Sequence, residues 1–157
     1  MTECGESGAL NIRLATGDDF EWAAQLMASM DPWRKLGRDF NQRLSLCRHP
    51  EYTLLIAESS ESRLACALMH QRGVAGSPYL ASLAVLPQEQ SRGVGSALLA
   101  FCESYFEGAR FFFLCVGSFN PRARALYERK GYTQVGELPD YAMVGASEFL
   151  YVKRMAP

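Results

Sequence analysis

A strand, a loop with two glycines and an amphipathic helix follow one another directly in the middle of the chain, and this succession constrains the fold more than any other feature. The strand is expected over residues 79–85, the loop contains Gly93 and Gly95, and the helix is expected over residues 93–106. The helix has apolar side chains at i, i+3, i+4 and i+7 spacing, so it buries one face. A strand that enters a helix through glycines points several backbone N–H groups at one spot. The segment therefore predicts an α/β fold with an anion-binding cradle.

The rest of the chain alternates between strand and helix patterns and contains no repeat or linker. With 157 residues, 48% of them apolar, the chain suits one core, which would remove roughly 70% of its unfolded surface from water. Further strands are expected at residues 10–15, 52–58, 64–71, 110–116, 132–138 and 148–153, and a break at 73–78. Further helices are expected at residues 16–30, 38–48 and 120–131, with Thr16 and Asn120 as N-caps. This order predicts a single α/β domain over residues 1–157 with helices on both faces of its sheet.

Charge and hydropathy exclude two classes of partner. Sixteen basic and seventeen acidic side chains give a net charge of −1, so no overall field draws the chain to nucleic acid. The longest apolar run, residues 111–116, is far shorter than the ~18 to 20 residues that cross a bilayer, and the first residues lack the basic and apolar regions of an export signal. We expect no nucleic-acid partner and no membrane partner.

The cysteines and histidines indicate a cytoplasmic protein without a metal site. The five cysteines, at positions 4, 47, 66, 102 and 115, form no C-x-x-C pair, and three of them lie in apolar stretches. They have the pattern of reduced core residues. Only two histidines are present, His49 and His70, so the common zinc patterns lack ligands.

Nucleotide-binding loops are the nearest alternatives for the glycine segment. A dinucleotide fingerprint needs a third glycine where Leu98 stands, and a phosphate-binding P-loop needs Gly-Lys-Ser/Thr after its loop. Neither requirement is met. Taken alone, Gly93 and Gly95 fit a phosphate approach and a simple tight turn about equally well.

A second motif begins twenty-five residues after Gly95. It is Asn120-x-x-Ala123-x-x-Leu126-Tyr127-x-x-x-Gly131-Tyr132, and it follows Gln90-x-x-Gly93-x-Gly95. The two in this order resemble the GCN5-related N-acetyltransferase family. The resemblance implies the acyl-CoA N-acyltransferase fold, a mixed, mostly antiparallel sheet of six or seven strands with a splayed central parallel pair and helices on both faces. It also implies transfer of an acetyl group from acetyl-CoA to a primary amine of a small molecule or peptide, and it leaves a homodimer open.

The resemblance also assigns the cofactor-binding residues. The end of the 79–85 strand would pair with the pantetheine amides, and the loop would hold the pyrophosphate. These positions are Leu83, Ala84, Val85, Gln90, Ser91, Arg92, Gly93, Val94, Gly95, Ser96, Asn120, Arg122, Ala123 and Tyr127.

Tyr127 is the one residue to which the resemblance gives a catalytic role, as general acid at the sulfur. Its helical spacing alone indicates a core position beside Ala123 and Leu126. A phenol with a reference pKa near 10 is a weaker acid than a thiol with a pKa near 8.5. Tyr127 must then act mainly by hydrogen bonding, or have its pKa lowered by Arg122, Arg124 and the helix N-terminus.

The chain departs from the family at the general base. Many members carry a glutamate where this chain has Ala81, followed by Ser82. An acceptor amine must lose a proton before it attacks, so water or another side chain has to take it. The candidates are His70, Asp140 and Glu148.

The acceptor is not specified by any motif. The resemblance places the acceptor groove near Asp31, Trp33 and Tyr141, whose carboxylate and aromatic rings suit a cationic amine. Packing and solvated-turn roles fit these residues equally well. Two other functions stay open: a non-catalytic acyl-CoA sensor or partner-binding module on the same fold, which Ala81 favours, and a nucleotide-binding α/β module.

Overall fold

The computed structural model describes residues 9–30, 34, 37, 39–60 and 62–155. Each predicted strand and helix is present, with ends that differ by up to three residues, and a short 3₁₀ helix, η1, was not predicted. The elements are β1 (Asn11–Leu14), α1 (Asp19–Ser29), α2 (Phe40–Cys47), β2 (Tyr52–Glu58), β3 (Arg63–Val74), β4 (Ser77–Val85), η1 (Pro87–Glu89), α3 (Val94–Tyr105), β5 (Phe111–Gly117), α4 (Pro121–Arg129), β6 (Thr133–Pro139) and β7 (Ser147–Arg154).

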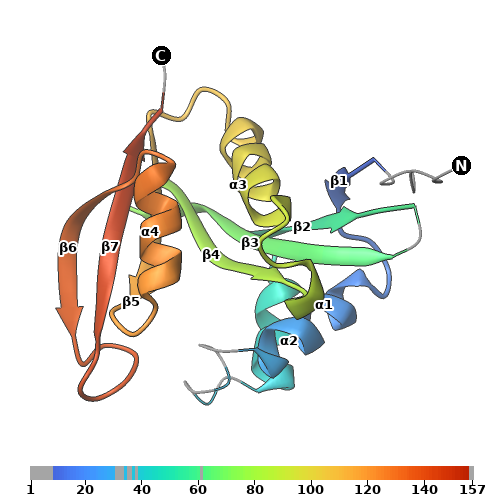
Figure 1. The fold of residues 1–157 in the computed structure, drawn as a ribbon, viewed down its shortest axis with the longest axis horizontal. Helices are drawn as coiled ribbons and strands as arrows, with labels where there is room; N and C mark the ends of the chain where they lie inside the picture. The colour runs from blue at the N-terminus through green and yellow to red at the C-terminus, as the bar shows by residue number, and fades with distance from the viewer. Residues whose placement is uncertain (1–8, 31–33, 35–36, 38, 61, 156–157) are drawn as a thin grey trace, which may run out of the picture.

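The strands form one mixed sheet in the order β1-β2-β3-β4-β5-β7-β6, in which only β4 and β5 are parallel neighbours. These two strands pair only at Tyr79 with Phe113 and at Leu80 with Leu114. Beyond that pair they separate, as Figure 1 shows. The predicted fold class is therefore confirmed, including the splayed central parallel pair.

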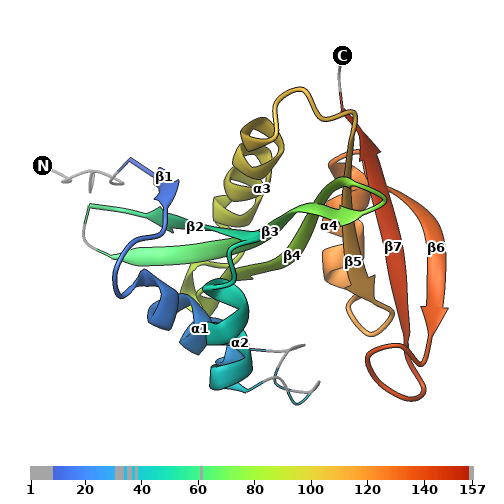
Figure 2. The ribbon, with the colours of Figure 1, turned by 180° about the vertical axis from the view of Figure 1, so that it is seen from behind.

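Helices cover both faces of the sheet. α3 and α4 pack against side chains such as Leu55, Phe112 and Tyr151, and we call this side the α3/α4 face. α1 and α2 pack against Ile56 and Leu68 on the other side, which we call the α1/α2 face (Figure 2). Because successive side chains of a strand point to opposite faces, β2, β3 and β4 each contribute to both cores.

A bulge in β4 lies beside the splayed pair. Leu68 of β3 stands opposite Ser82, whereas Met69 stands opposite Leu80, so Ala81 is an extra residue in β4. Leu80 and Leu83 pack on the α3/α4 face, and Ala81 packs on the α1/α2 face. The bulge thus changes which β4 side chains face each layer just where β5 departs.

Two details of the sequence prediction were wrong. Thr16 does not cap α1, because Asp18 is the N-cap and the backbone N–H of Thr16 instead donates to the buried carboxylate of Asp19 at 2.8 Å. The expected break at residues 73–78 is a hairpin in which β3 and β4 continue to a two-residue turn. Both turn residues, Ala75 and Gly76, have positive φ, which suits the twist of paired strands.

Three of the four cysteines in the described ranges, Cys47, Cys66 and Cys102, are buried, as expected. Burial raises the pKa of the Cys47 thiol to about 11 and that of Cys102 to about 12, so both remain protonated at neutral pH. Within the part of the chain that the structure describes, no helix has the length and apolar character to cross a membrane.

Candidate active site

A cavity of about 960 Å³ lies where β4 and β5 separate. It is reached from both faces of the sheet, because its lining includes residues of α3 and α4 and also residues of α2 and Met30, the C-cap of α1. Most of the predicted cofactor-binding residues line it, from stretches far apart in the chain. They are Leu83, Val85, Gln90, Ser91, Gly93, Gly95, Ser96, Asn120, Arg122, Ala123 and Tyr127.

Three predicted cofactor-binding residues lie outside this lining. Ala84 points to the α1/α2 core because of strand alternation, and Val94 is buried beneath the start of α3. Arg92 extends into solvent, with a loose ion pair to Glu89 at 3.8 Å. Their side chains therefore do not reach the cavity.

The loop between β4 and α3 forms an anion cradle from backbone atoms. Gln90 closes the loop by donating from Nε2 to the carbonyl of Val85 at 3.3 Å. Gly93 is the N-cap of α3, with φ +85°, and gives the helix no side-chain cap. The first N–H groups of α3 therefore lack intrahelical partners and carry the positive end of the helix dipole.

The two motif glycines differ in backbone conformation and in what surrounds them. Gly93 needs its left-handed conformation, and a Cβ built there meets no atom within 4 Å, so it would project into open space. Gly95 has an ordinary φ, and a Cβ there would make only a 3.5 Å contact with Val85. Neither is required by close packing within the protein. This open, backbone-lined cradle beside a helix start fits the pyrophosphate of a coenzyme A.

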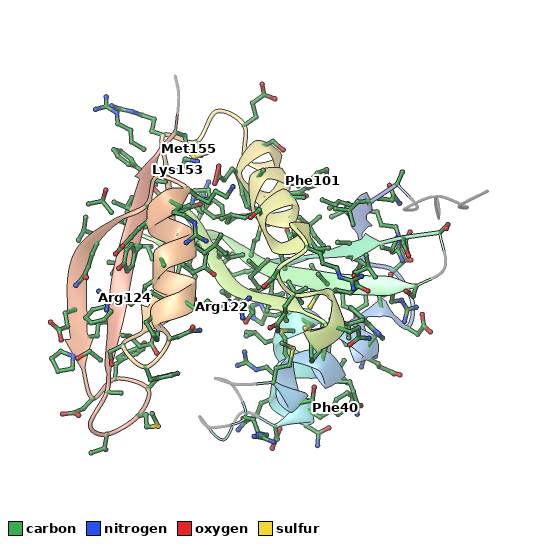
Figure 3. The ribbon with its side chains drawn as sticks, in the orientation of Figure 1. Phe40, Phe101, Arg122, Arg124, Lys153 and Met155 are labelled. Atoms are coloured by element: carbon green, nitrogen blue, oxygen red, sulfur yellow. The ribbon has the colours of Figure 1, made fainter. Side chains whose placement is uncertain are left out.

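The two motif halves meet at a side-chain contact. Arg122 on α4 donates a hydrogen bond from Nη2 to Oγ of Ser91 in the glycine loop. Arg124 leaves the opposite side of α4, as Figure 3 shows, where it lies 4.4 Å over the Phe149 ring and donates to the hydroxyl of Tyr151 at 3.3 Å. Arg122 is thus the cation of this helix that contacts the cradle, and Arg129 at the end of α4 also lines the cavity.

Asn120 confirms its predicted role as the N-cap of α4. Its Oδ1 accepts from the backbone N–H of Ala123 at 3.2 Å, and Pro121 occupies the first helical position. The cap fixes the start of α4, whose next turns carry Arg122 and Tyr127 into the cavity lining.

Tyr127 lines the cavity from the α3/α4 face and is only 9% exposed. Its ring meets Tyr132 edge-on, with centroids 5.9 Å apart. Burial, with a smaller effect of Cys102, raises the pKa of Tyr127 to about 12. Of the two alternatives for Tyr127, the structure contradicts a pKa lowered by the arginines, because Arg122 and Arg124 are directed to Ser91 and Tyr151. Tyr127 is therefore a neutral hydrogen-bond donor at physiological pH.

The α1/α2 side of the cavity is lined by polar side chains. They are Arg43, Tyr79, Ser82, Cys115, Tyr141 and Glu148. Ser82 is only 4% exposed, and its Oγ has no hydrogen-bond partner among the described residues. Burial raises the pKa of both the Cys115 thiol and the Tyr79 hydroxyl, and the nearby Glu148 carboxylate has a smaller effect in the same direction, so both stay protonated.

The three candidate bases differ in position. His70 does not line the cavity, since its Nε2 lies 3.3 Å from Glu51 and its Nδ1 accepts from the backbone of Arg72 at 3.0 Å. Asp140 also lies outside the lining and accepts from the backbone N–H of Gly145 at 2.7 Å. Glu148 is the one candidate that lines the cavity.

Of the predicted acceptor-binding residues, Tyr141 lines the cavity and is 71% exposed. Asp31 and Trp33 lie outside the described residues. Sequence reasoning missed Arg43, Tyr79 and Cys115, which belong to no motif. Only strand alternation combined with the pairing of β4, β5 and β7 would have placed Tyr79 and Cys115 together, and Arg43 comes from α2.

The solved structures most similar to this one include acetyltransferases with different acceptors. The Escherichia coli ribosomal-protein-S18-alanine N-acetyltransferase is 21% identical, with a TM-score of 0.76 over 95% of this chain and 97% of that one. Arabidopsis thaliana NAA60, solved with a bisubstrate analogue, is 17% identical, with a TM-score of 0.77 over 94% of this chain and 100% of that one. The Vibrio cholerae spermidine N-acetyltransferase, solved with CoA and spermine, is 15% identical, with a TM-score of 0.74 over 92% and 95%. At these identities the likeness establishes a shared fold.

Sequence comparisons give one family and no individual relative. A search of the curated proteins found no match. The model of the acetyltransferase (GNAT) family matches residues 17–132, which include both motifs and all of the elements from α1 to α4. The chain belongs to the acetyltransferase (GNAT) family.

Proposed function

We propose that this protein transfers an acetyl group from acetyl-CoA directly to a primary amine. The observation that carries the proposal is the contact of Arg122 with Ser91, which joins the two motif halves at the edge of one cavity. That cavity continues through the gap between β4 and β5 to the other face of the sheet. A thioester and an amine can thus enter from opposite faces and meet in the gap.

The α3/α4 side would hold the cofactor. The free N–H groups at the start of α3 and the guanidinium of Arg122 would bind the pyrophosphate, which is where positive charge is concentrated. The unpaired edge of β4 beyond Leu80 offers backbone groups to the pantetheine amides. When bound, acetyl-CoA supplies an activated acyl group with a thiolate leaving group.

Tyr127 would assist departure of the thiolate. Because its pKa is raised to about 12, full proton transfer to a thiolate is uphill, and the hydroxyl acts chiefly as a hydrogen-bond donor to the developing charge. Such a donor is more effective in a site from which water is largely excluded. The burial that raises the pKa therefore also strengthens this hydrogen bond.

The test is release of the CoA thiol from acetyl-CoA in the presence of an amine panel. The panel contains spermidine, nourseothricin and a peptide with an N-terminal alanine, which follow the names of similar structures, and free amino acids as a further class of primary amine. We expect amine-dependent release with at least one member and an acetylated product of the expected mass. Binding of acetyl-CoA without turnover across the panel would favour the non-catalytic acyl-CoA sensor instead.

A further inference from the structure

Glu148 is the single carboxylate among the described residues that line the cavity, and no histidine is among them. It stands near the start of β7, opposite Gly117 of β5 and opposite Leu138 of β6. It is therefore the one side chain of the described lining that is ordinarily an anion at neutral pH and can accept a proton from a bound ammonium group.

Strand alternation places this carboxylate on the α1/α2 side of the gap. Phe149 and Tyr151 of β7 pack on the α3/α4 face, so Glu148 points to the other face. Val116 of β5 also packs on the α3/α4 face, which directs Cys115 to the same side as Glu148. Tyr127 approaches the cavity from α4, on the opposite face. An acid and a base on opposite faces suit a reaction in which the two reactants enter from opposite faces.

We propose that Glu148 binds the ammonium group of a cationic acceptor and takes its proton, which replaces the carboxylate that is absent at Ala81. This inference rests on the proposed function and names the residue that makes the acceptor nucleophilic. The buried hydroxyl of Ser82, which has no partner in the described structure, lies on the same side and supplies a further hydrogen-bonding group to the acceptor.

The groups that face Glu148 support this role. Cys115 from β5 and Tyr79 from β4 interact with the carboxylate, and both stay neutral because burial, together with Glu148 itself, raises their pKa. Tyr141 lines the cavity from the loop after β6, and Arg43 lines it from α2. Among the described residues, Arg43 is the one cation that lines the cavity from the helices of this side, and both Arg43 and Glu148 make further interactions within the protein.

The protons and electrons balance as follows. The ammonium gives one proton to Glu148, and the freed nitrogen lone pair forms the C–N bond to the carbonyl carbon of the thioester. The C–S bond breaks and its electron pair goes to sulfur. The nitrogen then loses a second proton, the sulfur gains one with help from the Tyr127 hydroxyl, and Glu148 returns its proton to solvent. The products are the amide, the thiol and one net proton.

The test is the pH profile of kcat/KM for Glu148→Gln, with acetyl-CoA and whichever panel amine is turned over. Without the carboxylate, the reaction depends on the free amine already in solution, which is about 10⁻³ of an amine of pKa 10 at pH 7. We expect a loss of about 10² to 10³ at pH 7 that falls below about 10-fold near pH 10. Glu148→Asp, which keeps a shorter carboxylate, should retain the pH dependence of the parent. Glu137→Gln is the matched control, because that exposed carboxylate on β6 lies outside the cavity lining and bonds to Ser147 Oγ.

The outcomes separate this inference from the proposed function. A loss of the same size at every pH, in both Glu148 variants, would indicate packing and overturn the assignment. Equal losses in Glu137→Gln and Glu148→Gln would overturn it as a general charge effect. If the parent binds acetyl-CoA but no panel amine is turned over, the proposed function fails and this inference fails with it.

Discussion

The two sides of the cavity are built from different kinds of atoms. On the α3/α4 side the cradle consists mainly of backbone groups, with Gly93 as the N-cap of α3 and one arginine across from it. On the α1/α2 side the lining consists of side chains from separate strands, including Tyr79, Ser82 and Glu148. The first side is suited to a fixed anion, and the second to a ligand that varies.

This difference explains why one side has a sequence motif and the other has none. A backbone cradle needs a left-handed residue and a free helix start at fixed spacing, so few sequences can form it. A side-chain lining needs only the right residue on the right face of each strand, and many combinations satisfy that. The cofactor side can therefore be recognised from a single sequence, and the acceptor side cannot.

The largest expected effect is on the cofactor side, from Gly93→Glu. The variant forces a non-glycine residue into φ +85°, which costs about 1 to 2 kcal/mol, and places a carboxylate where the pyrophosphate would bind. Calorimetry should detect no binding of acetyl-CoA. Gly108→Glu is the matched control, since Gly108 has φ +93° and open space around its Cβ position but lies outside the cavity lining. It should show a similar loss of stability and unchanged binding; a folded Gly93→Glu protein that binds like the parent would contradict the cradle assignment.

The second-largest effect is expected on kcat, from a change at Tyr127, which lies at the boundary between the two sides of the cavity. Tyr127→Phe removes the hydroxyl and keeps the ring that meets Tyr132, so kcat should fall about 10² to 10⁴-fold with little change in acetyl-CoA affinity. Steady-state kinetics with a productive amine checks this, provided that chemistry is rate-limiting. Retention of more than about half of the parent kcat would return Tyr127 to a purely structural role.

The raised pKa of Tyr127 also predicts how the free energy of unfolding changes at alkaline pH. Its pKa is raised from about 10 to about 12, so the stability it contributes is fully present below pH 10 and is lost as the pH rises to 12. Between these values the unfolding free energy of the parent should fall relative to Tyr127→Phe by up to about 3 kcal/mol. Denaturant unfolding at pH 9 and at pH 11.5 measures the difference. A constant gap between the two proteins would mean that Tyr127 is not desolvated in solution.

How much of the site the sequence could predict follows the same division. The spacing of Gln90, Gly93 and Asn120 was sufficient to predict a cradle, a helix cap and the splayed strands through the family resemblance. It was not sufficient to bring Glu148 next to Cys115, because that neighbourhood depends on β7 inserting between β5 and β6. Pairing between strands that are not consecutive is a property of the whole sheet, and no local pattern encodes it.

The pKa of Tyr127 shows a second limit. The sequence places Arg124 three residues before Tyr127, and on a helix that spacing is near enough to lower its pKa, with Arg122 two residues further away. The structure directs Arg122 to Ser91 and Arg124 to Phe149, so burial dominates instead. The direction of a long side chain is set by tertiary contacts, which spacing along a helix does not specify.

A smaller effect is expected at the joint between the motif halves. Arg122→Ala removes the bond to Ser91 and one cation at the cradle, and it should weaken acetyl-CoA binding about 10-fold, since a charge-assisted hydrogen bond contributes about 1.5 kcal/mol or somewhat more. Arg124→Ala is the control from the same helix, and it should lower the Tm while leaving the affinity unchanged, because its contacts are with Phe149 and Tyr151. Calorimetry and thermal melts on both variants distinguish the two roles. Equal affinities of the two variants would show that the motif halves are not coupled through Arg122.

The smallest effect is expected on the acceptor side, and its sign is unusual for a buried position. The Ser82 hydroxyl is buried without a partner in the described structure, so the free protein carries the cost of desolvating it with no hydrogen bond in return. Ser82→Ala should therefore raise the unfolding free energy by about 1 kcal/mol, whereas Ser29→Ala, which removes a hydroxyl bonded to the carbonyl of Leu26 at 2.9 Å, should lower it slightly. If the bound acceptor supplies the hydrogen-bond partner that this hydroxyl lacks, the Ser82→Ala protein should show an acceptor KM raised a few-fold and an unchanged KM for acetyl-CoA. A gain in stability with no change in acceptor KM would separate Ser82 from the acceptor site and leave Glu148 and Tyr141 to define it.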